Sequence, residues 1–207
     1  MKISLPKIYP ITDRRLSGLS HTEQTREFIE GGATLIQVRE KSTDMRVFYD
    51  DVVDALDLAR EHGVTLLIND RVDIAMVTGA YGVHVGQDDL PPAEARKLLG
   101  PKAIIGLSTH NIEQVSDAMK EPIDYIAFGP IFSTSTKTDP DPIVGLDLLL
   151  DAKRTLAEIP IVAIGGIDAG NVALVLAAGA DSTAMISELY RGGDIATHYR
   201  ELSDLAD

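Results

Sequence analysis

The sequence predicts a single-domain (βα)8 barrel, the TIM-barrel fold, over residues 1–207. Short apolar segments rich in β-branched residues alternate along the chain with segments of helical periodicity, which is typical of βα-repeat folds. There are eight such apolar segments, and eight parallel strands close a barrel. An open doubly wound sheet is disfavoured because no G-x-G-x-x-G follows the first segment and polar residues follow nearly every segment.

Each predicted strand is a short apolar run, and most of them end in polar residues or glycine. The runs are residues 8–13, 34–40, 65–70, 82–87, 103–108, 124–130, 161–167 and 182–187. Such lengths suit strands, whereas helices usually need ten residues or more.

Four of the connecting segments carry clear helix signals. Residues 44–64 place Val52, Leu56 and Ala59 at helical spacing. Prolines begin the third of these segments and glycine ends it, as expected for a helix, and the others also end near glycine. The four segments are residues 20–33, 44–64, 91–100 and 170–180.

Composition narrows the class of protein. Hydrophobic residues make up 44% of the chain, enough for a substantial core, and there is no cysteine for disulfides or thiolate chemistry. A net charge of −13 argues against nucleic acid as the main partner. No stretch approaches the roughly 20 apolar residues of a membrane span, and the N-terminus lacks the apolar core of a signal peptide. We expect a cytoplasmic protein without membrane contact. The sequence does not determine the oligomeric state, and a homo-oligomer is one possibility.

Polar residues at the predicted strand ends carry the functional hypothesis, because active sites of βα barrels lie at the carboxyl ends of the strands. Strand ends are also often polar simply because water is near. The set nevertheless combines cations, carboxylates, hydroxyls and glycine backbone, the components of a site for phosphate and metal. Its members are Gln37, Arg39, Lys41, Asn69, Asp70, Gln87, Asp88, Asp89, Ser108, His110, Thr134, Thr136, Lys137, Gly165, Gly166 and Ser187.

Two parts of this set predict specific ligands. Asp70 and Asp89 follow adjacent strands and fit Mg²⁺, which takes one or two carboxylates plus phosphate oxygens, although one of them would alternatively cap the next helix. Gly165 and Gly166 let backbone approach a phosphate, although Gly-Gly also makes tight turns. The long, hydroxyl-rich segment that contains Lys137 is typical of a binding loop, and a solvated loop is the alternative.

Two anion sites on one rim indicate small phosphorylated substrates. Mg²⁺ together with Arg39, Lys41 and Lys137 supplies more positive charge than a phosphate monoester needs, and suits a diphosphate leaving group. Among the histidines, His110 is the one plausible general base, and His84 is expected to be a hydrogen-bonded core residue. The others, His21, His62 and His198, are expected at the surface.

Seven motifs occur in an order and spacing that resemble the thiamine-phosphate synthase family over residues 8–190. They are YPITD, QVREK, LLINDRVDIA, GVHVGQDDLP, GLSTHN, DYIAFGPIFSTSTK and VAIGGI. The resemblance implies a βα barrel that joins a hydroxymethylpyrimidine diphosphate to a thiazole phosphate or its carboxylated form. Thiamine phosphate and diphosphate are the implied products. The implied mechanism is a dissociative, Mg²⁺-assisted substitution in which diphosphate departs before the thiazole nitrogen attacks.

The resemblance also implies roles for individual residues. Asp70 and Asp89 would bind Mg²⁺, and Arg39, Lys41, Lys137 and Ser108 would act in catalysis. The pyrimidine diphosphate would be bound by Gln37, Arg39, Lys41, Asn69, Ser108 and Lys137. The thiazole phosphate would be bound by Thr134, Thr136, Gly166, Ile186 and Ser187, and Ser135 would be a further substrate-binding residue.

Two alternatives remain at this point. A thiazole tautomerase, similar in fold and sequence, would use His110 as an acid–base group, but the retained Thr134, Thr136 and Lys137 favour the synthase. A silent ligand-binding barrel is disfavoured because the metal-binding carboxylates and the cations are all present.

Overall fold

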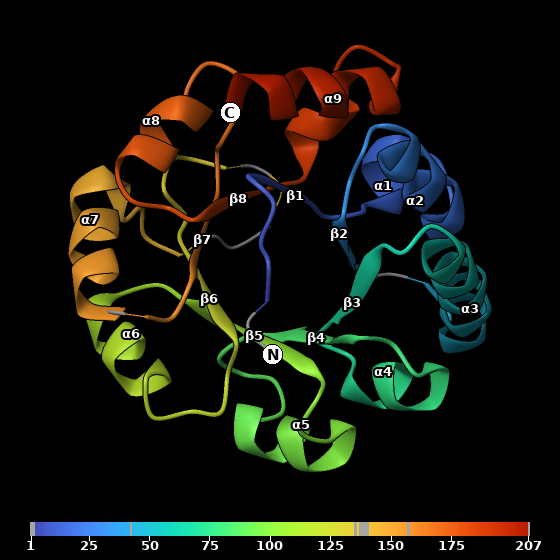
Figure 1. Cartoon of the computed structure of the whole chain (residues 1–207), viewed down its shortest axis with the longest axis horizontal. Coiled ribbons are helices and arrows are strands. Elements are labelled where there is room, and N and C mark those ends of the chain that lie inside the picture. The colour runs from blue at the N-terminus through green and yellow to red at the C-terminus, as the bar shows by residue number, and fades with distance from the viewer. Residues whose placement is uncertain (1–2, 42, 135, 137–140, 157, 207) are drawn as a thin grey trace.

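In the computed structural model, which describes residues 3–41, 43–134, 136, 141–156 and 158–206, eight parallel strands form one sheet. From β2 to β8 each strand pairs with its neighbours in sequence, and β1 pairs with β8. A parallel bridge between Ile11 and Gln37 joins the β1 side to β2, so that the sheet is nearly closed (Figure 1). The strands are β1 (Ile8–Pro10), β2 (Leu35–Val38), β3 (Thr65–Asn69), β4 (Gly82–Val85), β5 (Ile104–Thr109), β6 (Tyr125–Phe128), β7 (Ile161–Ile164) and β8 (Ser182–Met185). The predicted barrel is confirmed.

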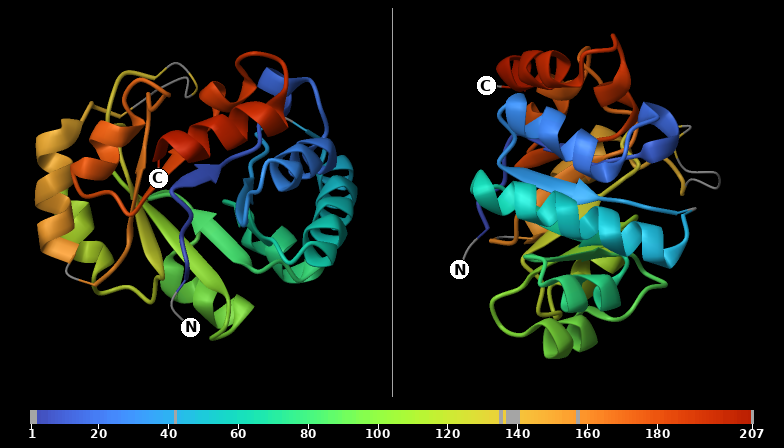
Figure 2. Two further views of the ribbon diagram at one scale, coloured as in Figure 1. Left: turned by 45° about the horizontal axis from the view of Figure 1, so that its top comes forward. Right: turned by 90° about the vertical axis from the view of Figure 1, so that its right-hand side faces the viewer.

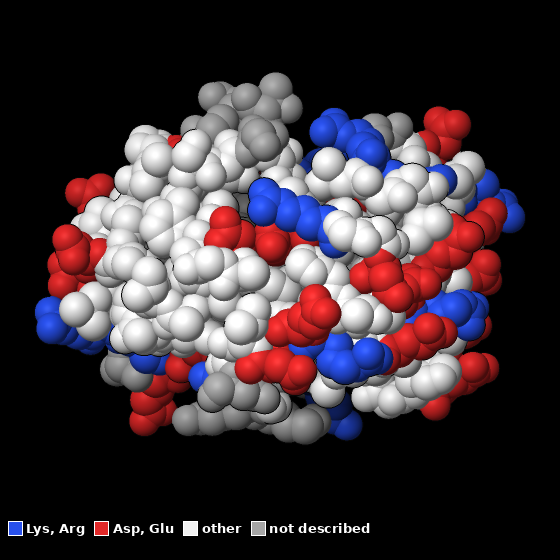
Figure 3. All heavy atoms as spheres, turned by 90° about the horizontal axis from the view of Figure 1, so that it is seen from above, with Lys and Arg blue, Asp and Glu red and all other residues white. Residues whose placement is uncertain are grey.

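The helices surround the strands, as the three views in Figures 1 and 2 show. The described helices are α1 (Arg14–Ser17), α2 (His21–Glu30), α3 (Met45–Glu61), α4 (Val72–Thr78), α5 (Pro92–Leu99), α6 (Ile112–Ala118), α7 (Gly145–Leu156), α8 (Val172–Ala177), the 3-10 helix η1 (Ser187–Tyr190) and α9 (Ile195–Ala206). Within the described ranges, no helix combines the length and apolarity needed to cross a membrane. Acidic and basic side chains lie interspersed on the face in Figure 3.

Alternation along each strand separates two cores. Ile36 and Val38 point outward and pack in the large cluster beneath the helices, whereas Leu35 belongs to a smaller cluster inside the barrel. Side chains alternate across a strand, so Gln37 faces the same way as Leu35, into the barrel. This arrangement explains why β2 is apolar on both faces except toward its carboxyl end.

The predicted strand through residue 40 is too long, because β2 ends at Val38. The amide of Arg39 donates to Thr12 Oγ1 at 3.1 Å, and the amide of Lys41 donates to Glu40 Oε1 at 2.7 Å. Side-chain acceptors thus take the place of strand partners. Arg39 and Lys41 consequently lie on a segment beyond the strand, at the mouth of the barrel.

Candidate active site

A cavity of about 860 Å³ occupies the mouth of the barrel, at the carboxyl ends of the strands. It brings together every predicted site residue that the structure describes. These are Gln37, Arg39, Lys41, Asn69, Asp70, Asp89, Ser108, Thr134, Thr136, Gly166, Ile186 and Ser187. Ser135 and Lys137 lie outside the described residues. Residues from all eight strands or the loops that follow them therefore converge on one cavity.

A continuous chain of hydrogen bonds crosses the floor of this cavity. Gln37 Nε2 donates to Tyr9 Oη at 3.0 Å, and Tyr9 Oη lies 3.2 Å from Tyr125 Oη. Tyr125 Oη lies 2.9 Å from His84 Nδ1, and His84 Nε2 lies 2.9 Å from Ser108 Oγ. Five strands each contribute one side chain, so the polar groups beneath the cavity are mutually satisfied.

Burial keeps this floor uncharged near neutral pH. Desolvation raises the pKa of Tyr9 to about 12 and raises that of Tyr125 well above its usual value. Desolvation also lowers the pKa of His84 to about 4. The floor therefore presents neutral donors and acceptors to whatever the cavity binds.

Sequence patterns do not single out the two tyrosines as site residues, and they indicate only the core position of His84. As expected, both ring nitrogens of His84 have partners, but the ring also lines the cavity. Tyr9 and Tyr125 lie within two of the predicted strands, where aromatic residues usually belong to the core. Their available signal was a hydroxyl on the inward-facing side of an apolar strand, because a buried phenol needs a hydrogen-bond partner.

Asp70 and Asp89 lie next to each other, after β3 and β4. The amide of Gly86 donates to Asp89 Oδ2 at 2.7 Å, which favours the ionised form. The pKa of Asp89 is nevertheless raised, chiefly by desolvation and to a smaller extent by the nearby Asp70 carboxylate. The hydrogen bond from Gly86 acts in the opposite direction. Neither aspartate caps a helix, because α4 begins after Arg71 and α5 after Pro91, without side-chain caps. The capping alternative is therefore wrong.

The backbone of Asp70 is strained. Its φ of 60° lies in the left-handed region, which costs a non-glycine residue roughly 1 kcal/mol or more. Its amide donates to the carbonyl of His84 at 2.8 Å, which holds it against β4. Strain of this kind concentrates at functional sites, where it aims a side chain.

The pair of aspartates fits a hard cation only as part of a shared site. Within the described residues, no group of three or more His, Cys, Asp or Glu side chains is placed to hold a metal ion. Two carboxylates leave most positions of an octahedral ion to phosphate oxygens and water, which is how Mg²⁺ is usually bound beside a phosphorylated substrate. The donor set therefore suits Mg²⁺ delivered with, or completed by, a substrate.

Two cations lie at the same rim, and one of them contacts Asp70. Lys41 Nζ forms an ion pair with Asp70 Oδ2. Arg39 Nη1 lies 3.5 Å from Asp13 Oδ2, and both of these side chains are largely buried. Asp13 is an additional cavity residue that the sequence reading missed. It caps α1 by accepting from the amides of Arg15 and Leu16.

The opposite side of the cavity is lined by close-packed glycine backbone. Gly166 has φ 65°, and a Cβ there would lie 2.5 Å from the carbonyl oxygen of Ser133. Its own carbonyl accepts from Asn171 Nδ2 at 3.0 Å. Only glycine fits this position, and Thr134 and Ser187 also line the cavity.

The histidine predictions need one correction. His110 lies at the cavity, where its Nδ1 is 2.7 Å from the carbonyl oxygen of Gly129, and His62 is exposed. His198 is partly exposed beside Glu188. The expectation that His21 lies at the surface is wrong, because its side chain is fully buried. A histidine directly after a helix cap looks solvent-facing in sequence, but this turn of α2 faces the barrel wall.

Comparison with known proteins agrees with the resemblance. Residues 8–189 match the family described as thiamine monophosphate synthase. The thiamine-phosphate synthase of Chloroflexus aurantiacus is 44% identical over 96% of this chain and 92% of its own length, and that of Koribacter versatilis is 46% identical over 90% of each. The solved structure of thiamine phosphate pyrophosphorylase from Pyrococcus furiosus superposes with a TM-score of 0.86 at 36% identity, covering 97% of this chain and 95% of that one. With its fold, its cavity and these relatives in agreement, the chain belongs to the thiamine-phosphate synthase family, whose members are transferases of thiamine biosynthesis.

Proposed function

We propose that this protein joins 4-amino-2-methyl-5-hydroxymethylpyrimidine diphosphate to 4-methyl-5-hydroxyethylthiazole phosphate, or its carboxylated form. The products are thiamine phosphate and diphosphate. One observation carries the proposal: a single cavity holds cations and paired carboxylates at the ends of β2 to β4, and close-packed glycine backbone after β7. A site for a diphosphate and a site for a phosphate monoester would thus share one reaction space.

The pyrimidine diphosphate is assigned to the β2–β5 side. Gln37 and Ser108 end the floor chain and offer neutral polar groups to a heterocycle, and Asn69 lies between them along the rim. Arg39 and Lys41 extend from the mouth and would bind diphosphate oxygens through charge-assisted hydrogen bonds. Lys137, outside the described residues, is assigned the same role.

Asp70 and Asp89 would hold Mg²⁺ together with diphosphate oxygens. When bound, the ion would offset the negative charge of the diphosphate. The closeness of the two carboxylates supports this assignment, because a cation between them would offset their mutual repulsion, which adds to desolvation in raising the pKa of Asp89.

The reaction is assigned a dissociative course. The bond between the pyrimidine methylene carbon and the diphosphate oxygen breaks first, and its electron pair leaves with diphosphate. The thiazole nitrogen then donates its lone pair to that carbon. Arg39, Lys41, Lys137 and Ser108 would stabilise the charge that grows on the leaving group, which is the step where fixed cations lower a barrier most.

The thiazole phosphate is assigned to the opposite wall. Thr134, Ser135, Thr136 and Ser187 would supply hydroxyls, Gly166 would supply close-approaching backbone, and Ile186 would contact the ring. The close packing around Gly166 supports this assignment, because the loop after the seventh strand of βα barrels frequently binds phosphate.

The test is to mix both substrates with Mg²⁺ and to measure diphosphate release and thiamine phosphate together. We expect the two products in equal amounts. Binding of either substrate without any release would instead favour a silent ligand-binding barrel. An Arg39→Ala variant serves as the matched control. Slower diphosphate release by this variant would show that the activity arises in this cavity.

A tautomerase remains the enzymatic alternative, and His110 separates the two. His110 Nδ1 faces the carbonyl of Gly129, so the ring is held by backbone at the edge of the cavity. We expect His110→Ala to retain most turnover and Lys137→Ala to lose it. The reverse pattern would favour acid–base chemistry at His110.

A further inference from the structure

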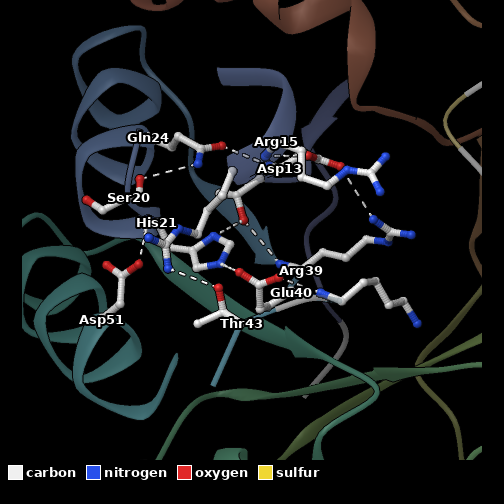
Figure 4. Close-up of polar contacts among 12 residues, drawn as sticks. Asp13, Arg15, Ser20, His21, Gln24, Arg39, Glu40, Thr43 and Asp51 are labelled. Atoms are coloured by element: carbon white, nitrogen blue, oxygen red, sulfur yellow. Dashed lines mark hydrogen bonds and ion pairs between the residues drawn. The ribbon is translucent and has the colours of Figure 1, made fainter. Parts of the chain in front are cut away.

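His21 is a fully buried histidine for which the proposed reaction has no direct use. It begins α2, and its ring lies between Thr12 after β1, Glu40 after β2 and Phe48 of α3. The ring packs edge-on against Phe48 at a centroid distance of 5.7 Å. Figure 4 shows Glu40 turned toward His21, while Arg39 runs the other way, toward Asp13 and Arg15.

One ring nitrogen of His21 contacts the segment that carries the two cations directly, and the other reaches it through Thr12. Nδ1 lies 2.8 Å from Thr12 Oγ1, and this same oxygen accepts the amide of Arg39 at 3.1 Å. Nε2 lies 3.4 Å from Glu40 Oε2, and the other oxygen of Glu40 accepts the amide of Lys41 at 2.7 Å. His21 therefore connects the two acceptors that hold the backbone on either side of Glu40.

One protonation state suits this arrangement. An ionised Glu40 offers only acceptors, so a hydrogen on Nε2 is favoured, and Nδ1 then accepts the hydroxyl hydrogen of Thr12, whose oxygen accepts from Arg39. At 3.4 Å the contact between Nε2 and Glu40 Oε2 is electrostatic and lacks hydrogen-bond geometry. Desolvation lowers the pKa of His21 and outweighs the opposing influence of Asp51 and Glu40. The ring is therefore neutral near pH 7, with one acceptor and one donor.

Helix α3 fixes the position of the His21 backbone, and with it the ring. Asp51 of α3 accepts the amides of His21 at 2.8 Å and Thr22 at 2.9 Å, and it also accepts the Thr22 hydroxyl at 2.7 Å. Ser20 and Glu23 complete a capping box at the same helix end. The start of α2 is thus anchored to α3 by three hydrogen bonds to Asp51.

We infer that His21 is a positioning residue: by tying Thr12 to Glu40 it holds residues 39–41 in the shape that presents Arg39 and Lys41 to the cavity. This inference rests on the proposed function, which assigns those two cations to the diphosphate. Glu40 is held back against α2, so its two neighbours in sequence project from the opposite side of the segment. Small displacements of groups that stabilise a transition state lower the reaction rate strongly. A buried residue that fixes the position of such groups therefore affects turnover.

The first test is a double-mutant cycle on kcat/KM for the pyrimidine diphosphate, with wild type, His21→Phe, Arg39→Ala and the double variant. Phenylalanine keeps the packing on Phe48 and removes both polar contacts. We expect His21→Phe to lower kcat/KM roughly 10- to 100-fold, with KM for the thiazole phosphate changed less than about twofold. The double variant should lose less than the product of the two single effects, since both act through one group.

Each alternative outcome has a distinct meaning. If Arg39→Ala is impaired while His21→Phe is not, or if the two effects multiply, the positioning role is rejected and the proposed function stands. If Arg39→Ala turns over like wild type, the diphosphate assignment is rejected and the inference falls with it. Leu56→Ala is the control for stability, because it opens a cavity in the core of α3 remote from the rim. The Leu56→Ala variant should have a lower Tm, and its kcat/KM should equal that of wild type at temperatures below its unfolding transition.

The second test needs no activity and covers the case in which His21→Phe does not fold. Amide exchange of Arg39 and Lys41 is measured by NMR in the ligand-free His21→Asn and His21→Gln variants. Asparagine places an acceptor near Nδ1, so the Arg39 amide should stay protected while the Lys41 amide exchanges faster. Glutamine places a donor near Nε2, so the pattern should reverse. Wild-type exchange of both amides in both variants would overturn the inference.

Discussion

Lys41 and Asp70 form an ion pair at the mouth of the barrel, between the segments that follow the adjacent strands β2 and β3. About half of the Lys41 side chain is exposed, so the pair contributes little to folding. Its significance lies in the charges it brings together. The proposed function gives Lys41 to the diphosphate and Asp70 to Mg²⁺, and each group holds the other in place until those ligands arrive.

Replacing Lys41 with alanine should lower kcat/KM for the pyrimidine diphosphate about 10- to 150-fold. This range corresponds to the loss of one charge-assisted hydrogen bond, on the order of 1.5–3 kcal/mol. Release of diphosphate is the measurement. Lys97→Ala is the matched control, since Lys97 pairs with Glu94 on α5, away from the cavity. Wild-type kinetics in Lys41→Ala would remove Lys41 from the proposed site.

Replacing Asp70 or Asp89 with asparagine should raise the Mg²⁺ concentration needed for half-maximal turnover by about tenfold or more, as for the loss of a metal ligand. The measurement is the rate of diphosphate release across a MgCl₂ series. Asp73→Asn is the control, because Asp73 pairs with Arg71 nearby but does not line the cavity. An unchanged Mg²⁺ requirement in both site variants would contradict the assignment.

Replacing Gly166 with alanine should raise KM for the thiazole phosphate by about tenfold or more, because displaced backbone no longer meets the phosphate. A Cβ would clash with Ser133 O at 2.5 Å and with Phe132 Cβ at 2.8 Å. Gly192→Ala separates the clash from backbone strain, since Gly192 has φ 87° but open space around it. Both variants should lose stability, and only Gly166→Ala should change KM. Equal KM values would argue that this loop does not contact the phosphate.

His84 should make folding sensitive to moderate acid. Burial lowers its pKa from 6.5 to about 4, so between these values the unfolded chain binds a proton that the folded protein does not. Its contribution to stability is therefore complete above about pH 6.5 and falls as the pH drops toward 4, by up to about 1.4 kcal/mol per pH unit. Urea midpoints at pH 7.5 and pH 5 measure this loss. His84→Gln should lose less than wild type over the same interval, and parallel losses would show that His84 does not titrate in this way.

Much of the site could be predicted because its residues occupy regular positions. Gln37 lies on the inward face of an apolar strand, and Asn69 and Asp70 follow the next strand directly, so local pattern alone places them at the carboxyl ends. The hydrogen-bonded chain at the floor of the cavity and the contacts of His21 beneath the rim could not be predicted in this way. Tyr9 and Tyr125 are separated by 116 residues, and they meet only because the barrel brings β1 and β6 to face each other across its interior.

Local sequence patterns suffice for the class of fold, the order of the strands and the residues that gather at the rim. These follow from the two-residue period of strands and the residues that punctuate them, both of which are local properties. The tertiary structure decided which of these residues touch. The pairing of Lys41 with Asp70, the burial of His21 against Glu40 and the end of β2 at Val38 all depend on segments brought together by closure of the sheet. Closure sets distances between side chains that are remote in the chain, and local patterns carry no information about those distances.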